Sequence, residues 1–201
     1  MLYNFSHFIL WPVFRWVFGF EVVGWEKVPR EGPVILCCNH ASFLDPPIVG
    51  LAMRKRAVWF MARDTLFRQP LFGALIRLLH AFPVKRGGVD RRAWKLFQDL
   101  VGSGRAVLVF PEGTRSPDGT LRAGKAGTGM LIRRCPGAAV IPVRIRGSEK
   151  ALPKGGKWFR RTKIQVAFGS AVPLEGEFAL ADERDTYQKI TDKVMAAIGR
   201  L

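Results

Sequence analysis

Short apolar runs alternate with longer amphipathic stretches along most of this 201-residue chain, and this alternation restricts the possible folds. Apolar runs bounded by Pro, Gly or Asn are typical of buried strands, whereas apolar residues at helical spacing indicate helices. We expect extended segments at 20–25, 34–38, 57–62, 81–84, 106–110, 139–145 and 163–168, and helices at 65–80, 90–100, 125–134 and 182–198. This order predicts an α/β fold in which helices flank a largely parallel mixed sheet.

The composition limits the kind of protein further. Hydrophobic residues make up 48% of the chain, which excludes a disordered protein. The length of 201 residues predicts a single domain, which we place at 21–201. The net charge of +16 implies an anionic partner, such as nucleic acid, anionic lipid, a phosphorylated metabolite or an acidic carrier protein. Charge alone does not choose among these partners.

Residues 1–20 predict an amphipathic helix of a different character from the rest. Phe, Trp, Leu, Ile and Val cover most of its circumference, but Arg15 and Glu21 interrupt the segment before it is long enough to cross a bilayer. We therefore expect this helix to lie in the membrane interface, with Trp11 and Trp16 at headgroup level. The alternative is an N-terminal helix packed on the core.

The first candidates for catalysis follow the apolar run 34–38. His40 comes directly after the run, and Asp45 precedes Pro46, which suits the first turn of a helix. We expect Asp45 to be the N-cap of a helix starting at Pro46, on a turn that brings its carboxylate to the imidazole. Such a pair makes a general base, whereas the alternative is a structural histidine beside an ordinary helix cap.

Two other strand ends carry charged groups. Lys85 and Arg86 follow 81–84, and Glu112 and Arg115 follow 106–110. The carboxyl ends of parallel strands meet at one edge of a sheet, where ligands bind. A base, a carboxylate and several cations at one edge indicate a phosphorylated substrate that carries a hydroxyl group, although the nearby glycines are also compatible with simple turns.

Four segments in order resemble the motifs of the glycerolipid acyltransferase family, whose type member is 1-acylglycerol-3-phosphate acyltransferase. Segment 39–45 resembles the His-x4-Asp motif, and segment 110–116 matches the third motif residue for residue. Segments 82–86 and 140–143 resemble the second and fourth motifs. The order and spacing agree over residues 24–146.

The resemblance implies transfer of a fatty acyl group from acyl-CoA or acyl carrier protein to a lysophospholipid hydroxyl, giving phosphatidic acid when the acceptor is 1-acylglycerol-3-phosphate. His40 would be the general base, and Asp45 would orient it. The residues that the resemblance assigns to acceptor binding belong to the second and third motifs: Lys85, Arg86, Glu112, Gly113, Thr114 and Arg115.

Within this set, the arginines and Lys85 would bind the acceptor phosphate, and an arginine could do so by a bidentate contact. Glu112 would accept a hydrogen bond from the glycerol hydroxyl or brace an arginine, while Gly113 and Thr114 would shape the loop. Backbone N–H groups of residues 39–42 are the expected oxyanion donors.

A lipid acceptor implies a peripheral or monotopic protein on the cytoplasmic face of the cell membrane. The basic and aromatic segment 155–163 could lie against anionic lipid, remain solvated, or dock the acidic donor. We expect no nucleic-acid partner, no metal, and no cofactor beyond the thioester co-substrate. Cys37 and Cys38 are adjacent on a strand and should point to opposite faces, so a joint metal site with His40 is not expected.

Two positions depart from the family pattern. His80 and Ala81 stand where members often carry a glycine, and Lys85 stands where an acidic or neutral residue is common. Both departures concern the acceptor head group, so glycerol-3-phosphate or another lyso-lipid, including a lyso-aminolipid, stays an alternative acceptor.

Two other classes of function are alternatives. A non-catalytic basic module that binds membrane or nucleic acid fits the charge but leaves the four motifs unexplained. A phosphohydrolase fits poorly, because no plausible metal cluster accompanies the loop carboxylates.

Overall fold

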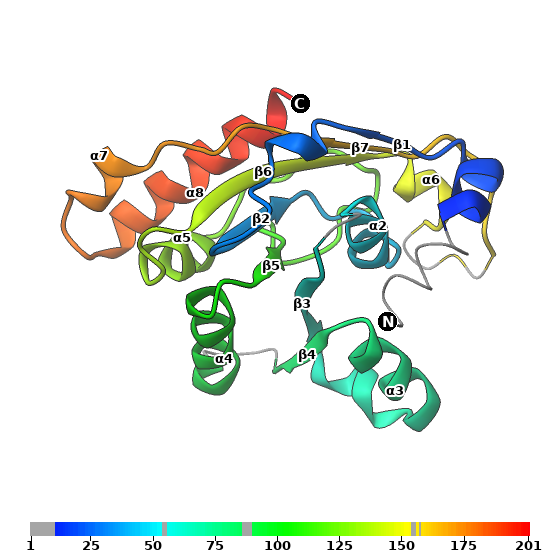
Figure 1. The fold of residues 1–201 in the computed structure, drawn as a ribbon, viewed down its shortest axis with the longest axis horizontal. Helices are drawn as coiled ribbons and strands as arrows, with labels where there is room; N and C mark the ends of the chain where they lie inside the picture. Colours follow the sequence, from blue (N-terminus) through cyan, green and yellow to red (C-terminus); the bar gives the residue numbers. More distant parts are fainter. Residues whose placement is uncertain (1–10, 54–55, 86–89, 154–155, 157) are drawn as a thin grey trace.

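A computed structural model describes residues 11–53, 56–85, 90–153, 156 and 158–201. They form a seven-stranded sheet in the order β1-β7-β6-β2-β5-β3-β4 (Figure 1). The strands are β1 (Glu21–Val23), β2 (Val34–Cys38), β3 (Val58–Arg63), β4 (Ala81–Val84), β5 (Ala106–Val109), β6 (Ala139–Arg146) and β7 (Gln165–Phe168). All neighbours pair in parallel except β6 and β7, which confirms the predicted α/β class with a largely parallel mixed sheet.

The central strand β2 shows why its sequence is a continuous apolar run. It lies between β5 and β6, with Val34 opposite Ala106 on one side and Ala139 on the other. All five of its residues are buried, because both faces of a parallel sheet are covered. Cys37 and Cys38 belong to the hydrophobic clusters on opposite faces, as their adjacency predicts.

Helices cover both faces of the sheet (Figure 1). The cluster on one face receives side chains from α2 (Asp45–Ala52), α3 (Pro70–Leu78) and the segment around Phe18. The cluster on the other face receives them from α4 (Arg91–Gly102), α5 (Ala126–Arg133) and α8 (Arg184–Gly199). Four short helical segments lie between these elements: η1 (Trp25–Lys27), η2 (Asp64–Arg68), α6 (Ser148–Ala151) and α7 (Glu175–Phe178).

The predicted N-terminal helix falls partly outside the described residues, since its first ten positions are not among them. Residues 11–18 are helical and lead into β1. Phe18 is buried against the core, whereas Trp16 is 76% exposed, so this segment has both a packed side and a free apolar side. Within the described part of the chain, no helix combines the length and the apolar character needed to cross a bilayer.

Candidate active site

The site is built on the turn between β2 and α2, where one carboxylate oxygen collects three hydrogen bonds. Asp45 Oδ2 lies 2.8 Å from His40 Nδ1, and it accepts the backbone N–H of Ala41 at 2.7 Å and of Ser42 at 2.8 Å. The Asp45 side chain is fully buried, while the His40 side chain is 17% exposed. The bond at Nδ1 orients the imidazole and leaves Nε2 for another partner.

The prediction that Asp45 caps a helix starting at Pro46 is wrong in its detail. Asp45 is the first residue of α2, the cap position is Leu44, and no side chain caps the helix. A capping carboxylate would bind the N–H groups two or three residues later, but Pro47 has none and Ile48 N–H donates to the Leu44 carbonyl. The Asp45 carboxylate therefore turns back toward His40.

The loop after β5 holds His40 from its other side. His40 N–H donates to Glu112 Oε1 at 3.0 Å, and the His40 carbonyl accepts the Ser116 N–H at 2.7 Å. The imidazole stacks on the Phe110 ring, with centroids 4.0 Å apart and 20° between the planes. The first and third predicted motifs thus form one unit around His40.

Glu112 contacts the backbone of His40. Its side chain is almost fully buried, and its Oε1 accepts the His40 N–H, while a hydrogen bond of Glu112 to an acceptor hydroxyl stays a prediction. Burial raises the pKa of Glu112, and the N–H groups of His40 and Arg122 oppose that rise. Gly113 has a φ of 67°, the left-handed conformation that lets the loop turn directly after Glu112.

Arg115 reaches back to the His40 turn. Its guanidinium lies over the Phe43 ring, 3.5 Å from the centroid, and Phe43 itself is exposed. Stacking on an aromatic face orients the planar guanidinium of an arginine. Thr114 is half-buried between Gly113 and Arg115. The structure thus brings Arg115 to the turn that carries His40 and Asp45.

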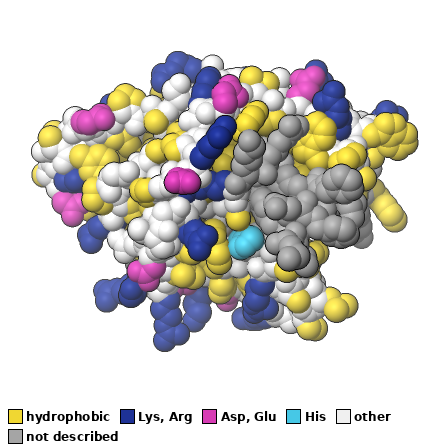
Figure 2. Space-filling view, in the orientation of Figure 1, with side chains coloured by type: hydrophobic (Ala, Val, Ile, Leu, Met, Phe, Trp, Pro, Cys, Tyr) yellow, Lys and Arg dark blue, Asp and Glu magenta, His cyan; other side chains and the backbone are white. Residues whose placement is uncertain are grey.

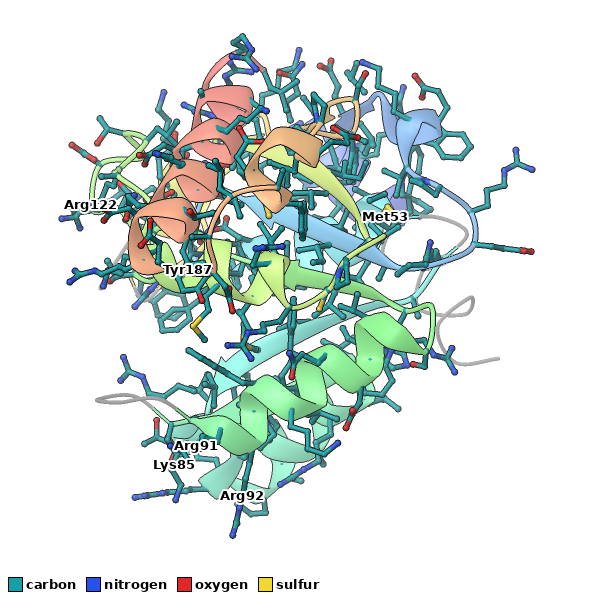
Figure 3. The ribbon with its side chains drawn as sticks, turned by 90° about the vertical axis from the view of Figure 1, so that its left-hand side faces the viewer. Met53, Lys85, Arg91, Arg92, Arg122 and Tyr187 are labelled. Carbon is teal, nitrogen blue, oxygen red and sulfur yellow. The ribbon has the colours of Figure 1, made fainter. Side chains whose placement is uncertain are left out.

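The cations of the second motif lie further away. Lys85 is exposed at the end of β4, which is separated from β2 by β5 and β3, or about 14 Å of sheet. Figure 3 shows Lys85 beside Arg91 and Arg92 at the start of α4, pointing away from the sheet. Arg86 lies outside the described residues. A contact of Lys85 with the phosphate held near His40 would need its long side chain to turn inward.

The expected oxyanion donors are already in use. The N–H groups of His40, Ala41 and Ser42 all donate to the carboxylates of Glu112 and Asp45. Those three groups therefore do not point at a reacting carbonyl, and this expectation is wrong for them. Their hydrogen bonds fix the turn instead.

The chain is similar to known proteins over most of its length. The family model described as Acyltransferase matches residues 19–146, which is more than half of the chain. The chain belongs to this acyltransferase family. The match spans β1 to β6 and includes His40, Asp45, Glu112 and Arg115.

Relatives and a solved structure of the acyltransferase agree with this assignment. The chain is 26% identical to the 1-acyl-sn-glycerol-3-phosphate acyltransferase of Bacillus subtilis, covering 91% of this chain and 88% of the relative. It is 32% identical to a chloroplast enzyme of that name from Arabidopsis thaliana, covering 77% of this chain but only 44% of the longer relative. The crystal structure of PlsC, the 1-acyl-sn-glycerophosphate acyltransferase of Thermotoga maritima, is 26% identical and superposes with a TM-score of 0.73, covering 96% of this chain and 78% of that chain.

Sequence reasoning missed several residues that shape the site of this acyltransferase. Asn39 exchanges two hydrogen bonds with the Ile145 backbone, at 2.9 and 2.7 Å, and so extends the pairing of β2 with β6 up to the turn. Ser42 Oγ donates to the Leu152 carbonyl, and Phe110 and Phe43 provide the two ring contacts. The position of Asn39 directly before the His-x4-Asp motif was a local sequence signal for such a side-chain contact with the backbone.

The cysteine thiols are buried, two of them on the strand that leads to His40. Cys37, Cys38 and Cys135 are buried, and burial raises the pKa of each thiol, that of Cys135 to about 11. A buried thiol with a raised pKa carries little of the reactive thiolate at neutral pH. Among the described residues, no group of three or more His, Cys, Asp or Glu side chains is arranged to hold a metal ion.

Proposed function

We propose that this acyltransferase transfers a fatty acyl group from an acyl thioester to the free hydroxyl of 1-acylglycerol-3-phosphate, giving phosphatidic acid. The observation that carries the proposal is the 2.8 Å contact between His40 Nδ1 and the buried Asp45 carboxylate. The names of the Bacillus and Arabidopsis relatives support this choice of acceptor.

In the proposed reaction, His40 Nε2 takes the proton of the acceptor hydroxyl while the hydroxyl oxygen attacks the thioester carbonyl. Asp45 holds the imidazole by Nδ1–H and stabilises its protonated form. The tetrahedral intermediate then expels the thiolate, which receives the proton from His40, so that an ester and a free thiol leave the enzyme. General-base assistance of this kind contributes roughly 10²–10⁴ in rate.

Arg115 is the proposed primary ligand of the acceptor phosphate. Its stacking on Phe43 holds the guanidinium beside the turn that carries the base. Glu112 supports this arrangement from within the protein through the His40 backbone. Arg86 and Lys85 are proposed as outer cations that attract the phosphate, a role that tolerates the greater distance of Lys85.

The donor is proposed to be acyl-CoA or acyl carrier protein, as a co-substrate and without further cofactor. Because the acceptor and the product are lipids, we propose that the enzyme works at the cytoplasmic face of the cell membrane, held by anionic lipid. Nucleic acid is not a proposed partner, despite the net charge of +16.

Purified protein incubated with palmitoyl-CoA and lysophosphatidate, with the products identified by mass, tests the proposal. We expect phosphatidic acid from the wild type and a loss of about 10³ or more in kcat for His40→Ala. Asp99→Asn is the control, because it changes an exposed side chain on α4 and should keep the wild-type kcat. A panel with glycerol-3-phosphate and a lyso-aminolipid distinguishes the acceptors.

Near wild-type turnover in His40→Ala would overturn the base assignment. A preference for another acceptor in the panel would overturn the choice of lysophosphatidate and leave the acyl-transfer chemistry in place.

A further inference from the structure

Helix α3 exposes an apolar face that the described part of the molecule does not cover. Leu71 is 89% exposed, Leu75 50% and Leu78 55%, and these positions lie on one side of the helix. Phe72 beside them is also exposed. Single exposed leucines are ordinary in proteins, but this number in a nine-residue helix marks an interaction surface.

This face belongs to a firmly seated helix. Gly73 packs so closely on η2 that an added Cβ would lie 2.8 Å from the Phe67 carbonyl oxygen. Ile76 is buried in the core, and the Arg77 guanidinium lies 5.0 Å from the centroid of the Phe67 ring. The helix therefore holds its leucines outward while its other side is fixed to the domain.

Charge favours one kind of partner for this surface. Between Asp64 and Asp90 the sequence has no acidic residue, whereas Arg68, just before the start of α3, and Arg77, on α3 itself, are both exposed. An apolar centre with a cationic margin fits the surface of a bilayer that contains anionic phospholipid. A second copy of the chain would instead bring two cationic margins together, which costs free energy.

The position of α3 agrees with such a partner. It starts just after the carboxyl end of β3, the sheet edge on which His40 also lies, and runs back to the start of β4. Figure 1 places α3 and the helix of residues 11–18 toward the same end of the molecule, with α8 toward the other. Figure 2 shows hydrophobic side chains protruding at that end of the molecule. Trp158 and Phe159 are exposed, and the Arg161 guanidinium lies 5.8 Å from the centroid of the Trp16 ring.

We propose that the α3 face, formed by Leu71, Phe72, Leu75 and Leu78, inserts into the interface of an anionic phospholipid bilayer. It is an anchor separate from residues 1–20, and it brings the edge that carries His40 to the membrane. Its purpose, to deliver a lipid acceptor to His40, rests on the proposed function, but the insertion itself can be measured without any turnover.

The first test compares Leu71→Asp/Leu75→Asp with wild type for sedimentation with vesicles of phosphatidylglycerol and phosphatidylcholine. Two charges on an inserted face should lower the partition coefficient by at least about tenfold. Leu180→Asp is the matched control, since Leu180 is an exposed leucine beside α7, and it should bind as wild type does. Equal binding of all three proteins would overturn the proposal.

Activity separates this proposal from the proposed function. With a short-chain lysophosphatidate dissolved as a monomer, the double variant should keep the wild-type kcat, and with vesicle-borne acceptor its apparent KM should rise. Loss of activity with the soluble acceptor as well would show damage to the fold, and Leu71→Gln/Leu75→Gln would then have to show the binding defect for the proposal to stand. If the wild type shows no turnover, the proposed function is overturned, but the result of the vesicle-binding test still stands.

The second test places a polarity-sensitive nitrobenzoxadiazole dye on Leu71→Cys. Selective labelling is possible because the three native cysteines are buried. The emission should shift to the blue on addition of anionic vesicles, and the same dye on Leu180→Cys should not respond. A dimeric wild type in light scattering, made monomeric by the double variant with unchanged vesicle binding, would assign the face to a second copy instead.

Discussion

A single oxygen atom, Asp45 Oδ2, organises the chemistry at the scale of the residue. It accepts hydrogen bonds from one imidazole and two backbone N–H groups within a turn of six residues, from His40 to Asp45. The two backbone N–H groups hold the Asp45 carboxylate in place independently of the imidazole. The orientation of the His40 ring is therefore set by a carboxylate whose own position is fixed by the turn. Such pre-organisation is what a general base needs, because its ring must not turn away from the substrate.

Asp45→Asn separates this orienting role from the fold. The amide oxygen can still accept backbone N–H groups, so we expect the variant to fold, but it carries no charge to stabilise the protonated imidazole. The kcat should fall by about 10²–10⁴, with little change in the KM for the acceptor. Steady-state kinetics and urea unfolding measure the two effects. Asp99→Asn, which changes an exposed aspartate on α4, should alter neither, and an unchanged kcat in Asp45→Asn would contradict the role assigned to that carboxylate.

Glu112→Gln tests a buried charge through the pH dependence of stability. Burial raises the pKa of Glu112 above its ordinary 4.5, so the folded protein keeps a proton there at a pH where the unfolded chain has lost it. The wild-type free energy of unfolding should therefore fall as the pH rises from 4.5 through the raised pKa. The glutamine variant should lose that part of the fall and still accept the His40 N–H.

Urea unfolding at a series of pH values between 4.5 and 8 provides the comparison. Glu175→Gln, at an exposed position on α7, should keep the wild-type slope. Identical slopes for Glu112→Gln and wild type would show that the buried carboxyl group does not titrate in this range.

At the scale of the element, the turn from α3 to β4 explains one departure from the family pattern. His80 has a φ of 66° and is the one residue other than glycine with a positive φ among the described residues. Glycine adopts this conformation without steric cost, which accounts for the glycine that family members often carry just before the second motif. In this chain the His80 ring also contacts Trp59, at 4.9 Å between centroids.

His80→Val and His80→Asn separate the backbone from the ring contact. Both variants lose the contact with Trp59, but asparagine tolerates the left-handed region and valine does not. We expect His80→Val to be less stable than His80→Asn by about 1–2 kcal/mol, measured by thermal or urea unfolding. Equal stability of the two variants would mean that the turn rearranges and stores no backbone strain.

The elements also show what the sequence could predict and what it could not. The strand at 34–38 was predicted because burial on both sheet faces produces a continuous apolar run, which is a local pattern. The helix predicted at 90–100 corresponds to α4, and Asp90 caps it by accepting the Arg92 and Ala93 N–H groups. The bonds between Asn39 and Ile145 join residues 106 positions apart, and no local pattern encodes them.

The site follows the same division between local and distant contacts. His40 and Asp45 are five positions apart, and their pairing was predicted from the turn between them. The contact of Glu112 with the His40 backbone and the stacking of Phe110 on the imidazole depend on how β2 and β5 lie side by side. Residues that support a catalytic group from a neighbouring strand therefore need the register of the sheet.

At the scale of the whole molecule, two forces of different range would act between the protein and the proposed membrane partner. The net charge of +16 would attract anionic lipid over a distance set by the ionic strength, whereas the apolar face of α3 would act only on contact. Salt therefore weakens the first force and leaves the second nearly unchanged. The two contributions can be separated by salt alone, without a substitution.

We expect added NaCl to raise the apparent KM for lysophosphatidate in anionic vesicles, because screening shortens from about 10 Å at 0.1 M to about 3 Å at 1 M. A soluble short-chain acceptor should respond less, since in the proposed complex its phosphate would meet Arg115 at close range, and Arg115 stacks on the Phe43 ring. In neutral phosphatidylcholine vesicles the salt effect should nearly disappear, while binding through apolar contacts persists. An equal response to salt with soluble and vesicle-borne acceptor would place the effect at the phosphate site, and the excess positive charge would then serve the substrate and not the membrane.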